Sequence, residues 1–243
     1  MIGCNWEAQK TMRISRKTAG GKTYFVVSEL DPLCHKAAKD LGFVEAEDGF
    51  SRAFETDTLH IDQIFARFAS SAEEMILQAA GVRPVPWDKA LLSFLQRASG
   101  ENVDWWLAGS GALAIRGIDL VPRDLDIITD RDGALRLGRA MSEWLVEPVQ
   151  ESHGWIAKWF GRAFAHARIE WVGDVEKWVD DRGPSDFGPM AGDRLQTVRW
   201  SGYTIRVPPL EMQLEACERR GLKDRAQKIQ QALGTCKDDL GPH

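Results

Sequence analysis

The sequence lacks any long apolar run, and this absence excludes one class of protein at once. Nowhere do the 243 residues approach the roughly 18 consecutive apolar residues of a membrane-spanning helix, so we expect no membrane partner. The first ten residues, MIGCNWEAQK, also lack the apolar core of a secretory signal. We therefore expect a cytoplasmic protein in which residues 1–11 form a loose leader.

The sequence has few cysteines, and its basic residues do not outnumber its acidic residues. The four cysteines form no C-x-x-C pair and no metal-ligand spacing, which favours reduced thiols in a cytosolic protein. The formal net charge of −5 excludes the electrostatic footprint of a general duplex nucleic-acid binder, although a local basic cluster could still hold a nucleotide or an RNA end. Internal repeats and low-complexity tracts are absent as well.

What the sequence does contain is typical of a globular protein with one large domain or two modest ones. The stretch VRPVP, with Pro84 and Pro86, predicts an extended linker. We accordingly predict a small α+β N-terminal domain of unknown role over 1–82, a linker over 83–89, a larger domain over 90–235 and a tail over 236–243.

The stretch VDWWLAGSGALAIRGIDLVPRDLDIITD, Val103 to Asp130, reads as strand, tight turn, helix, loop and strand. At the turn, Gly109 allows the backbone to approach a phosphate closely, and Ser110 adds a hydroxyl. The helix that follows offers free N–H groups to an anion. Alone, such a turn is more often structural than functional.

Asp124 and Asp126 lie two residues apart at the second strand, so strand alternation turns both carboxylates to one face. They repel each other unless a cation offsets them, and Mg²⁺ suits oxygen ligands; the alternative is a solvent-facing pair. Glu170 lies in the apolar strand segment FAHARIEWV, where an acid is costly to bury unless it coordinates or pairs. If the two strands lie side by side, the three carboxylates converge as a two-metal site requires.

Elsewhere the patterns predict further elements. In the N-terminal part we expect a strand over 22–28 and a helix from Pro32 to Leu41 capped by Asp31. Downstream we expect a helix that is capped by Asp132 and reaches Leu145, a turn at Gly161-Arg162, and a strand over 164–172. A hairpin over 195–207 with Ser201-Gly202 at its turn is followed by two helices, over 210–220 and 222–233.

The joint motif, LAGSGALAIRG followed by PRDLDII, resembles the hydrophobic-Gly-Ser, then Asp-x-Asp, signature of the DNA polymerase β-like nucleotidyltransferase superfamily. Glu170 takes the place of the third acid, where Asp is more usual. The resemblance covers residues 100–175 and, more loosely, 195–233, where the chain is similar to small bacterial members such as aminoglycoside nucleotidyltransferase-like proteins and AbiEii-type toxins. It implies an α+β fold, with a mixed sheet flanked by helices.

The resemblance implies transfer of a nucleoside monophosphate from an NTP such as ATP to an acceptor hydroxyl, with release of pyrophosphate. It implies that Asp124, Asp126 and Glu170 bind two Mg²⁺ ions and that Glu170 assists in deprotonating the acceptor. Gly109 and Ser110 would contact the β- and γ-phosphates.

Basic residues near the motif are less certain in role. Arg123 is a candidate phosphate contact or a surface ion pair. Relatives often carry a lysine in the helix corresponding to 210–220, whose charged residues here are acids, Arg219 and Arg220. Lys223 or Arg220 is therefore the candidate triphosphate cation, or both belong to a solvated helix end.

The acceptor stays open between a small molecule, a tRNA 3′ end and a protein. The acidic balance favours a small molecule or a protein, although a tRNA-modifying toxin needs only a local basic patch. Two other classes also stay open: a catalytically silent nucleotide-binding or regulatory module that keeps the fold, and an N-terminal domain that binds a partner.

Overall fold

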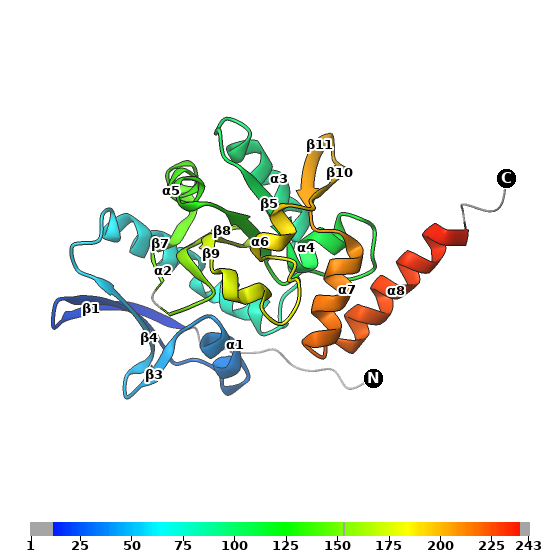
Figure 1. Ribbon diagram of the computed structural model, residues 1–243. Helices are drawn as coiled ribbons and strands as arrows, with labels where there is room; N and C mark the ends of the chain where they lie inside the picture. Colours follow the sequence, from blue (N-terminus) through cyan, green and yellow to red (C-terminus); the bar gives the residue numbers. More distant parts are fainter. Residues whose placement is uncertain (1–11, 153, 239–243) are drawn as a thin grey trace, which may run out of the picture. The chain divides into compact units, whose positions relative to one another are not determined.

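The computed structural model describes residues 12–152 and 154–238, so the expected leader over 1–11 lies outside the described residues. The chain divides into two units, Met1–Pro84 and Val85–His243, and the division falls inside the segment 83–89. Helix α3 begins at Trp87, so it includes the last residues of that segment. Figure 1 shows the elements of each unit.

The first unit is a four-stranded antiparallel sheet with helices, in the strand order β1-β2-β4-β3. Its elements are β1 (Arg13–Ala19), β2 (Lys22–Ser28), the 3-10 helix η1 (Pro32–Cys34), α1 (His35–Asp40), β3 (Val44–Ala46), β4 (Gly49–Glu55) and α2 (Ile61–Ala79). The predicted strand over 22–28 matches β2, and Asp31 caps η1 by accepting a hydrogen bond from the Leu33 N–H. Phe25 packs against Phe54 and Phe68 in the core.

The second unit contains a five-stranded mixed sheet in the order β5-β6-β9-β8-β7. Its elements are α3 (Trp87–Ala98), β5 (Trp105–Ala108), α4 (Gly109–Ala114), β6 (Leu125–Thr129), α5 (Arg131–Ala140), η2 (Ser142–Trp144), β7 (Leu145–Glu151), β8 (Ala157–Ala165), β9 (Ala167–Val175), η3 (Lys177–Asp180), α6 (Pro189–Gly192), β10 (Gln196–Trp200), β11 (Tyr203–Val207), α7 (Leu210–Arg219) and α8 (Lys223–Asp238). Strand β6 pairs with β9 in parallel, and the other neighbours pair antiparallel. The predicted α+β class with a mixed sheet is confirmed.

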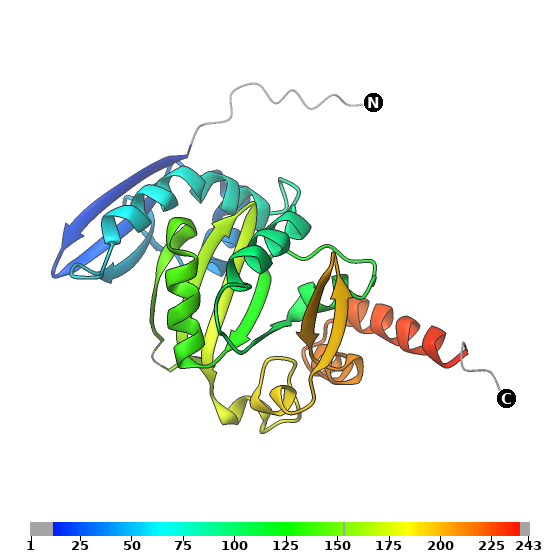
Figure 2. The same cartoon turned by 90° about the horizontal axis from the view of Figure 1, so that it is seen from above.

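Helices α3 and α5 cover one face of this sheet (Figure 2). Alternation along β6 and β9 turns Leu125, Ile127, Ile169 and Trp171 away from water, all of them fully buried. The Trp171 indole N–H donates to the Ala134 carbonyl of α5, which fixes the side of the sheet that this row faces. The residues between them, Asp126 and Glu170 among others, therefore face the opposite side.

Three local predictions were wrong. The strand predicted over 164–172 is divided by a turn at His166, where β8 ends and β9 begins. The helix after β6 begins at Arg131 and ends at Ala140, and it is Asp130 that caps it, by accepting from the Gly133 N–H at 2.6 Å. Gly161-Arg162 is not a turn but lies inside β8. Glycine stands at 161 because the Trp171 ring packs there: a Cβ atom would lie 2.3 Å from that ring.

The C-terminal part follows the predictions more closely. The hairpin β10–β11 is confirmed, with Ser201 and Gly202 in the left-handed region at its turn. Helices α7 and α8 lie against each other (Figure 1), with Cys217, Ala226 and Ile229 in a shared apolar cluster. Helix α8 extends to Asp238, into the segment predicted as a tail.

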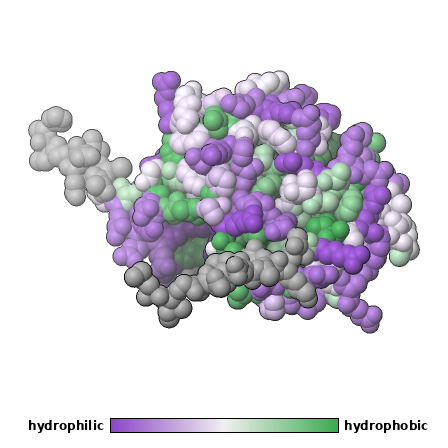
Figure 3. Space-filling view, turned by 180° about the vertical axis from the view of Figure 1, so that it is seen from behind, coloured by the Kyte–Doolittle hydropathy of each residue, from purple (hydrophilic) through white to green (hydrophobic). Residues whose placement is uncertain are grey.

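Among the described residues, no helix is long and apolar enough to cross a membrane. On the face drawn in Figure 3, hydrophilic residues surround small separate groups of hydrophobic ones.

Candidate functional site

Three carboxylates converge on the face of the mixed sheet opposite to the one that α3 and α5 cover. The parallel register of β6 and β9 sets Asp126 directly opposite Glu170. Asp124 immediately precedes β6 and projects to the same face. One ligand oxygen from each of the three residues lies within 4.8 Å of the others. The structure thus brings together the three acids that the sequence analysis singled out.

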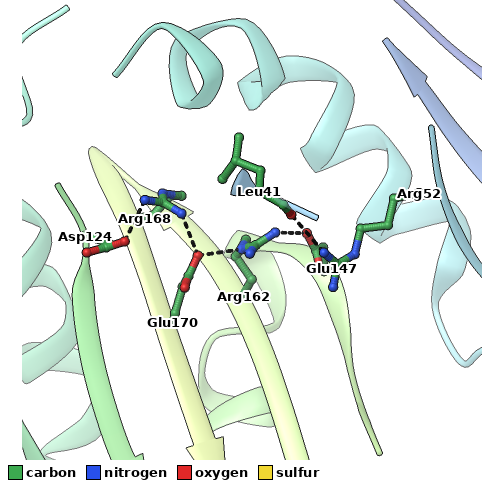
Figure 4. A network of polar contacts seen from close by, with 7 residues as sticks. All are labelled: Leu41, Arg52, Asp124, Glu147, Arg162, Arg168 and Glu170. Atoms are coloured by element: carbon green, nitrogen blue, oxygen red, sulfur yellow. Dashed lines mark hydrogen bonds and ion pairs between the residues drawn. The ribbon is translucent and has the colours of Figure 1, made fainter. Parts of the chain in front are cut away.

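Two arginines from neighbouring strands bind this acidic cluster (Figure 4). Arg168 bridges two of the acids, with Nη2 at 2.6 Å from Asp124 Oδ2 and Nη1 at 2.8 Å from Glu170 Oε1. Arg162 of β8 donates from Nε to the same Glu170 oxygen at 2.7 Å. Its Nη1 donates to Glu147 of β7. Negative and positive charges therefore alternate along the path of contacts from Asp124 through Arg168, Glu170 and Arg162 to Glu147.

The burial of these groups makes the alternation energetically important. The side chains of Arg162 and Glu147 are 5% and 2% exposed, so neither charge is screened by water. Burial alone would lower the pKa of Arg162, but Glu147 and Glu170 outweigh it and raise that pKa. Arg162 therefore stays charged and holds the two carboxylates.

Asp126 has the most unfavourable electrostatic position. Burial, followed by the charges of Asp124, Glu170 and Asp186, raises the pKa of Asp126 well above its ordinary value. Burial also raises the pKa of Asp124, with Arg168 as the largest opposing charge. A cation at the three acids would favour their ionised forms, and carboxylate oxygens are the ligands that Mg²⁺ takes. The donor set therefore fits a hard divalent ion.

The Gly109 turn lies against this cluster. Gly109 has φ +60°, and a Cβ atom built on it would lie 2.2 Å from Asp126 Oδ2. Glycine is required there for both the backbone conformation and the close approach. The neighbouring Ser110 is buried, and α4 begins at this turn.

A fourth carboxylate, which the sequence analysis missed, is bound to the same turn. The Gly109 N–H donates to Asp186 Oδ2 at 3.1 Å. Gln213 of α7 donates to the Gly109 carbonyl at 3.0 Å and to Asp186 Oδ2 at 3.4 Å. The residue of α7 that faces the turn is therefore a neutral amide. Asp186 lies in the loop between η3 and α6. A loop has no hydrophobic periodicity, so the sequence does not predict which of its residues point into the protein.

The other predicted site residues are spread out. Arg123 is exposed, and Lys223 is exposed at the first position of α8. Arg220, at the end of α7, lines a pocket together with Gly109, Asp126 and Glu170. Among the described residues, Arg220 is thus the triphosphate-cation candidate that lies at the acids.

Comparisons with known proteins add the following. No protein-family model matches the chain. No curated protein matches it. Among solved structures, one similar chain is a protein proposed to be a nucleotidyltransferase, from Thermotoga maritima, with a TM-score of 0.46 and 26% identity over 60% of this chain and 91% of the other. Another is ANT(2″)-Ia in complex with adenylyl-2″-tobramycin, with a TM-score of 0.41 and 12% identity over 63% of this chain and 93% of the other.

Both TM-scores lie below 0.5, so any assignment of function depends on the residues of this chain.

Proposed function

We propose that the chain is a Mg²⁺-dependent nucleotidyltransferase, which transfers a nucleoside monophosphate from an NTP to an acceptor hydroxyl and releases pyrophosphate. The observation that carries this proposal is the convergence of Asp124, Asp126 and Glu170 within 4.8 Å on one sheet face. A Gly-Ser turn directly against Asp126 supports it, because the motif and the acids then belong to one site.

In this mechanism the three acids would hold the metal ions, and bound Mg²⁺ would neutralise phosphate charge and make the acceptor hydroxyl more acidic. Glu170 accepts the proton of that hydroxyl, or assists its removal. Arg162 and Arg168 act through Glu170, because each donates to its Oε1 and so restrains the direction of the carboxylate. Catalysis then consists of positioning and of stabilising charge.

The phosphate end of the site is assigned to the Gly109 turn. Ser110 and the Gly109 N–H would contact the β- and γ-phosphates, and Arg220 would supply the cation. Because the Gly109 N–H donates to Asp186 in this structure, a phosphate must replace that carboxylate to use the same donor. The roles of Arg123 and Lys223 stay predictions, since both side chains are exposed.

The acceptor is a small molecule, a tRNA end or a protein, and the tRNA case corresponds to a toxin-type enzyme. Two observations favour a second candidate function, a catalytically silent nucleotide-binding module. The Gly109 N–H already binds a carboxylate, and α7 presents the neutral Gln213 to the turn. Both features weaken the attraction of the turn for a triphosphate.

The experiment that tests the proposal is mass spectrometry of an acceptor panel incubated with each NTP and Mg²⁺, together with measurement of released pyrophosphate. We expect turnover by the wild-type protein and its loss in Asp124→Asn and Asp126→Asn. Asp132→Asn, at an exposed acid of α5, is the matched control and should keep full activity. Binding of NTP without pyrophosphate release across the panel would favour the silent module, and turnover by both active-site variants would refute the mechanism.

A further inference from the structure

On the sheet face that bears the acids, one row of residues is charged and the neighbouring row is apolar. One row contains Asp126 and Glu170, in register with Arg162. The next row, two residues further along each strand, contains Ile128 and Val172. An apolar surface therefore begins directly beside the acids, within one strand repeat.

Aromatic side chains extend this apolar surface into a pocket. Phe160, in register with Val172, continues the apolar row, and Trp155 meets it edge to face with ring centroids 5.5 Å apart. Phe187 and Ile156 complete the wall. The pocket has a volume of about 330 Å³ and also reaches Asp126 and Glu170. Apolar walls with few polar groups and a volume of at least about 300 Å³ are typical of small-molecule sites.

Trp155 is the side chain best placed to contact a ligand. It lines the pocket although 45% of its surface is exposed, whereas most of the other apolar lining residues are largely buried. An exposed indole at the mouth of an apolar pocket offers a face on which another flat ring can stack.

Asp186 gives the pocket a polar end. The residue is 6% exposed, and its Oδ2 is bound by the Gly109 N–H and the Gln213 amide. Its Oδ1, by contrast, has no hydrogen-bond partner among the residues that the structure describes. A buried acceptor without a partner is energetically unfavourable, so a donor group on a ligand would be stabilised there.

The charge of the lining decides which part of a substrate fits. Three carboxylates, Asp126, Glu170 and Asp186, line the pocket together with a single cation, Arg220. Without a metal ion at these acids, a polyphosphate or a nucleic-acid backbone would be repelled from such a wall, whereas an uncharged ring would not.

We propose that this pocket binds a planar ring of a substrate, stacked on Trp155 and packed against Phe160, with an N–H or O–H group of the ring directed to Asp186. The inference rests on the proposed function in that the ring belongs to one of the two substrates of the adjacent acids. It is either the base of the donor nucleotide or a ring of the acceptor. The ring chemistry is common to both sources, and the experiment separates them.

The test measures binding by equilibrium dialysis and saturation-transfer NMR. Adenosine and benzyl alcohol are the uncharged ring probes, Mg²⁺–tripolyphosphate is the charged probe without a ring, and an ATP analogue with a methylene bridge between the α- and β-phosphates combines both. The variant is Trp155→Ala. Its matched control is Trp178→Ala, which removes an indole that is 53% exposed and is not part of the pocket lining.

We expect Trp155→Ala to weaken the binding of at least one ring probe by about fivefold or more, as loss of one stacking contact implies. Trp178→Ala should leave the same affinity unchanged, and neither variant should alter tripolyphosphate binding. Equal ring-probe affinities in wild type and Trp155→Ala, or no binding of either ring probe to wild type, would overturn the proposal. Thermal unfolding of both variants shows that the comparison is between folded proteins.

The ATP analogue identifies the source of the ring. If it displaces the ring probe, and Trp155→Ala weakens the analogue but not tripolyphosphate, the pocket holds the donor base. If ring probe and analogue bind together, the pocket holds a ring of the acceptor. Failure of the proposed function looks different: no Mg²⁺-dependent binding of tripolyphosphate or analogue to wild type, whatever the ring probes do.

A second variant tests the polar end. Purine riboside lacks the exocyclic amino group of adenosine, so the ratio of their affinities measures the contribution of that donor. We expect wild type to prefer adenosine, and Asp186→Asn, in which an amide replaces the carboxylate, to lose this preference. A ratio that is the same in both proteins would remove Asp186 from the proposed contact.

Discussion

At the scale of single residues, Gly109 shows how closely backbone and chemistry constrain each other. Its φ of +60° disfavours any residue with a Cβ atom, and a Cβ atom there would lie 2.2 Å from Asp126 Oδ2. Gly117 also has a positive φ, +82°, but within the described part of the chain no heavy atom lies within 4 Å of its Cβ position. Comparison of substitutions at Gly109 and Gly117 therefore separates the effect of backbone strain from the effect of the contact with Asp126.

We predict that Gly109→Ala and Gly117→Ala each lower the free energy of unfolding by about 1–2 kcal/mol through backbone strain. Gly109→Ala should lose more, because Asp126 must also move, and it alone should weaken Mn²⁺ binding. Urea unfolding and an electron paramagnetic resonance titration with Mn²⁺ measure the two effects. Equal Mn²⁺ affinities in the two variants would contradict the close approach.

Asp126 provides a prediction about pH. Burial and then the charges of Asp124, Glu170 and Asp186 raise its pKa in the folded protein. The folded state therefore favours the protonated form, and the free energy of unfolding falls as pH rises from the unfolded-state pKa of about 3.9 through the raised folded-state pKa. Asp126→Asn removes this pH-dependent fall in the free energy of unfolding, because an amide side chain does not ionise.

In the presence of a chelator, we expect Asp126→Asn to unfold at a higher temperature than wild type at neutral pH. The difference should vanish below about pH 4, where Asp126 is protonated in both states. Mg²⁺ should raise the unfolding temperature of wild type but not of the variant, because ligand binding to the folded state stabilises it. Parallel pH profiles of the two proteins would show that the raised pKa does not influence stability.

At the scale of elements, Arg162 links three strands. Its cross-strand partners are Glu170 on β9 and Glu147 on β7, and it forms an ion pair with each. Arg162→Met would remove this cation from the buried Glu147 and from the partly buried Glu170, which keeps Arg168. We predict a loss of about 3–5 kcal/mol in the free energy of unfolding.

The control is Arg97→Met, which removes an exposed ion pair with Glu143 and a cation–π contact with Trp144. We expect it to lower the free energy of unfolding by no more than about 1 kcal/mol. Denaturant unfolding of both variants gives the comparison. Similar losses in the two would mean that the burial of the Arg162 network adds no stability.

The elements with a clean local pattern could be predicted from the sequence, and those shaped by tertiary contacts could not. Strands β6 and β9 follow apolar alternation, and the hairpin β10–β11 is announced by Ser201-Gly202. Strand β7 was missed because LVEPVQE contains Pro148 and the acid Glu147. The strand tolerates Pro148 because β7 lies at the edge of the sheet and its pairing has register shifts. It tolerates Glu147 because that acid is paired with Arg162.

The residues of the candidate site also fall into two groups, those that could be predicted from the sequence and those that could not. Asp124 and Asp126 could be found because two residues along one strand fix a common face. Asp186 and Gln213 could not, because each reaches the Gly109 turn from an element distant in the sequence. Loop residues such as Asp186 follow no period, and Gln213 has the polarity of a surface residue although it is 1% exposed.

At the scale of the whole molecule, every group of the candidate site belongs to the unit Val85–His243. This unit has its own core, including Leu107, Leu125 and Trp171. We predict that residues 85–243 expressed alone fold and bind Mn²⁺ with an affinity within about twofold of the full chain, because a domain with its own core can fold by itself. Calorimetry and the Mn²⁺ titration check this. A fragment that folds but has lost Mn²⁺ affinity would contradict the prediction.

The parallel pairing of β6 with β9 also determines when the site comes into existence during synthesis. Asp126 and Glu170 are neighbours in space, yet α5, β7 and β8 lie between them in the sequence. Chains emerge from the ribosome N-terminus first, and pairing between distant strands is slow to form. A nascent chain that ends before Ala167 carries Asp124 and Asp126 without the third acid. Prematurely terminated translation products therefore lack the complete acidic cluster, and the proposed activity can begin only after the parallel strand has been made.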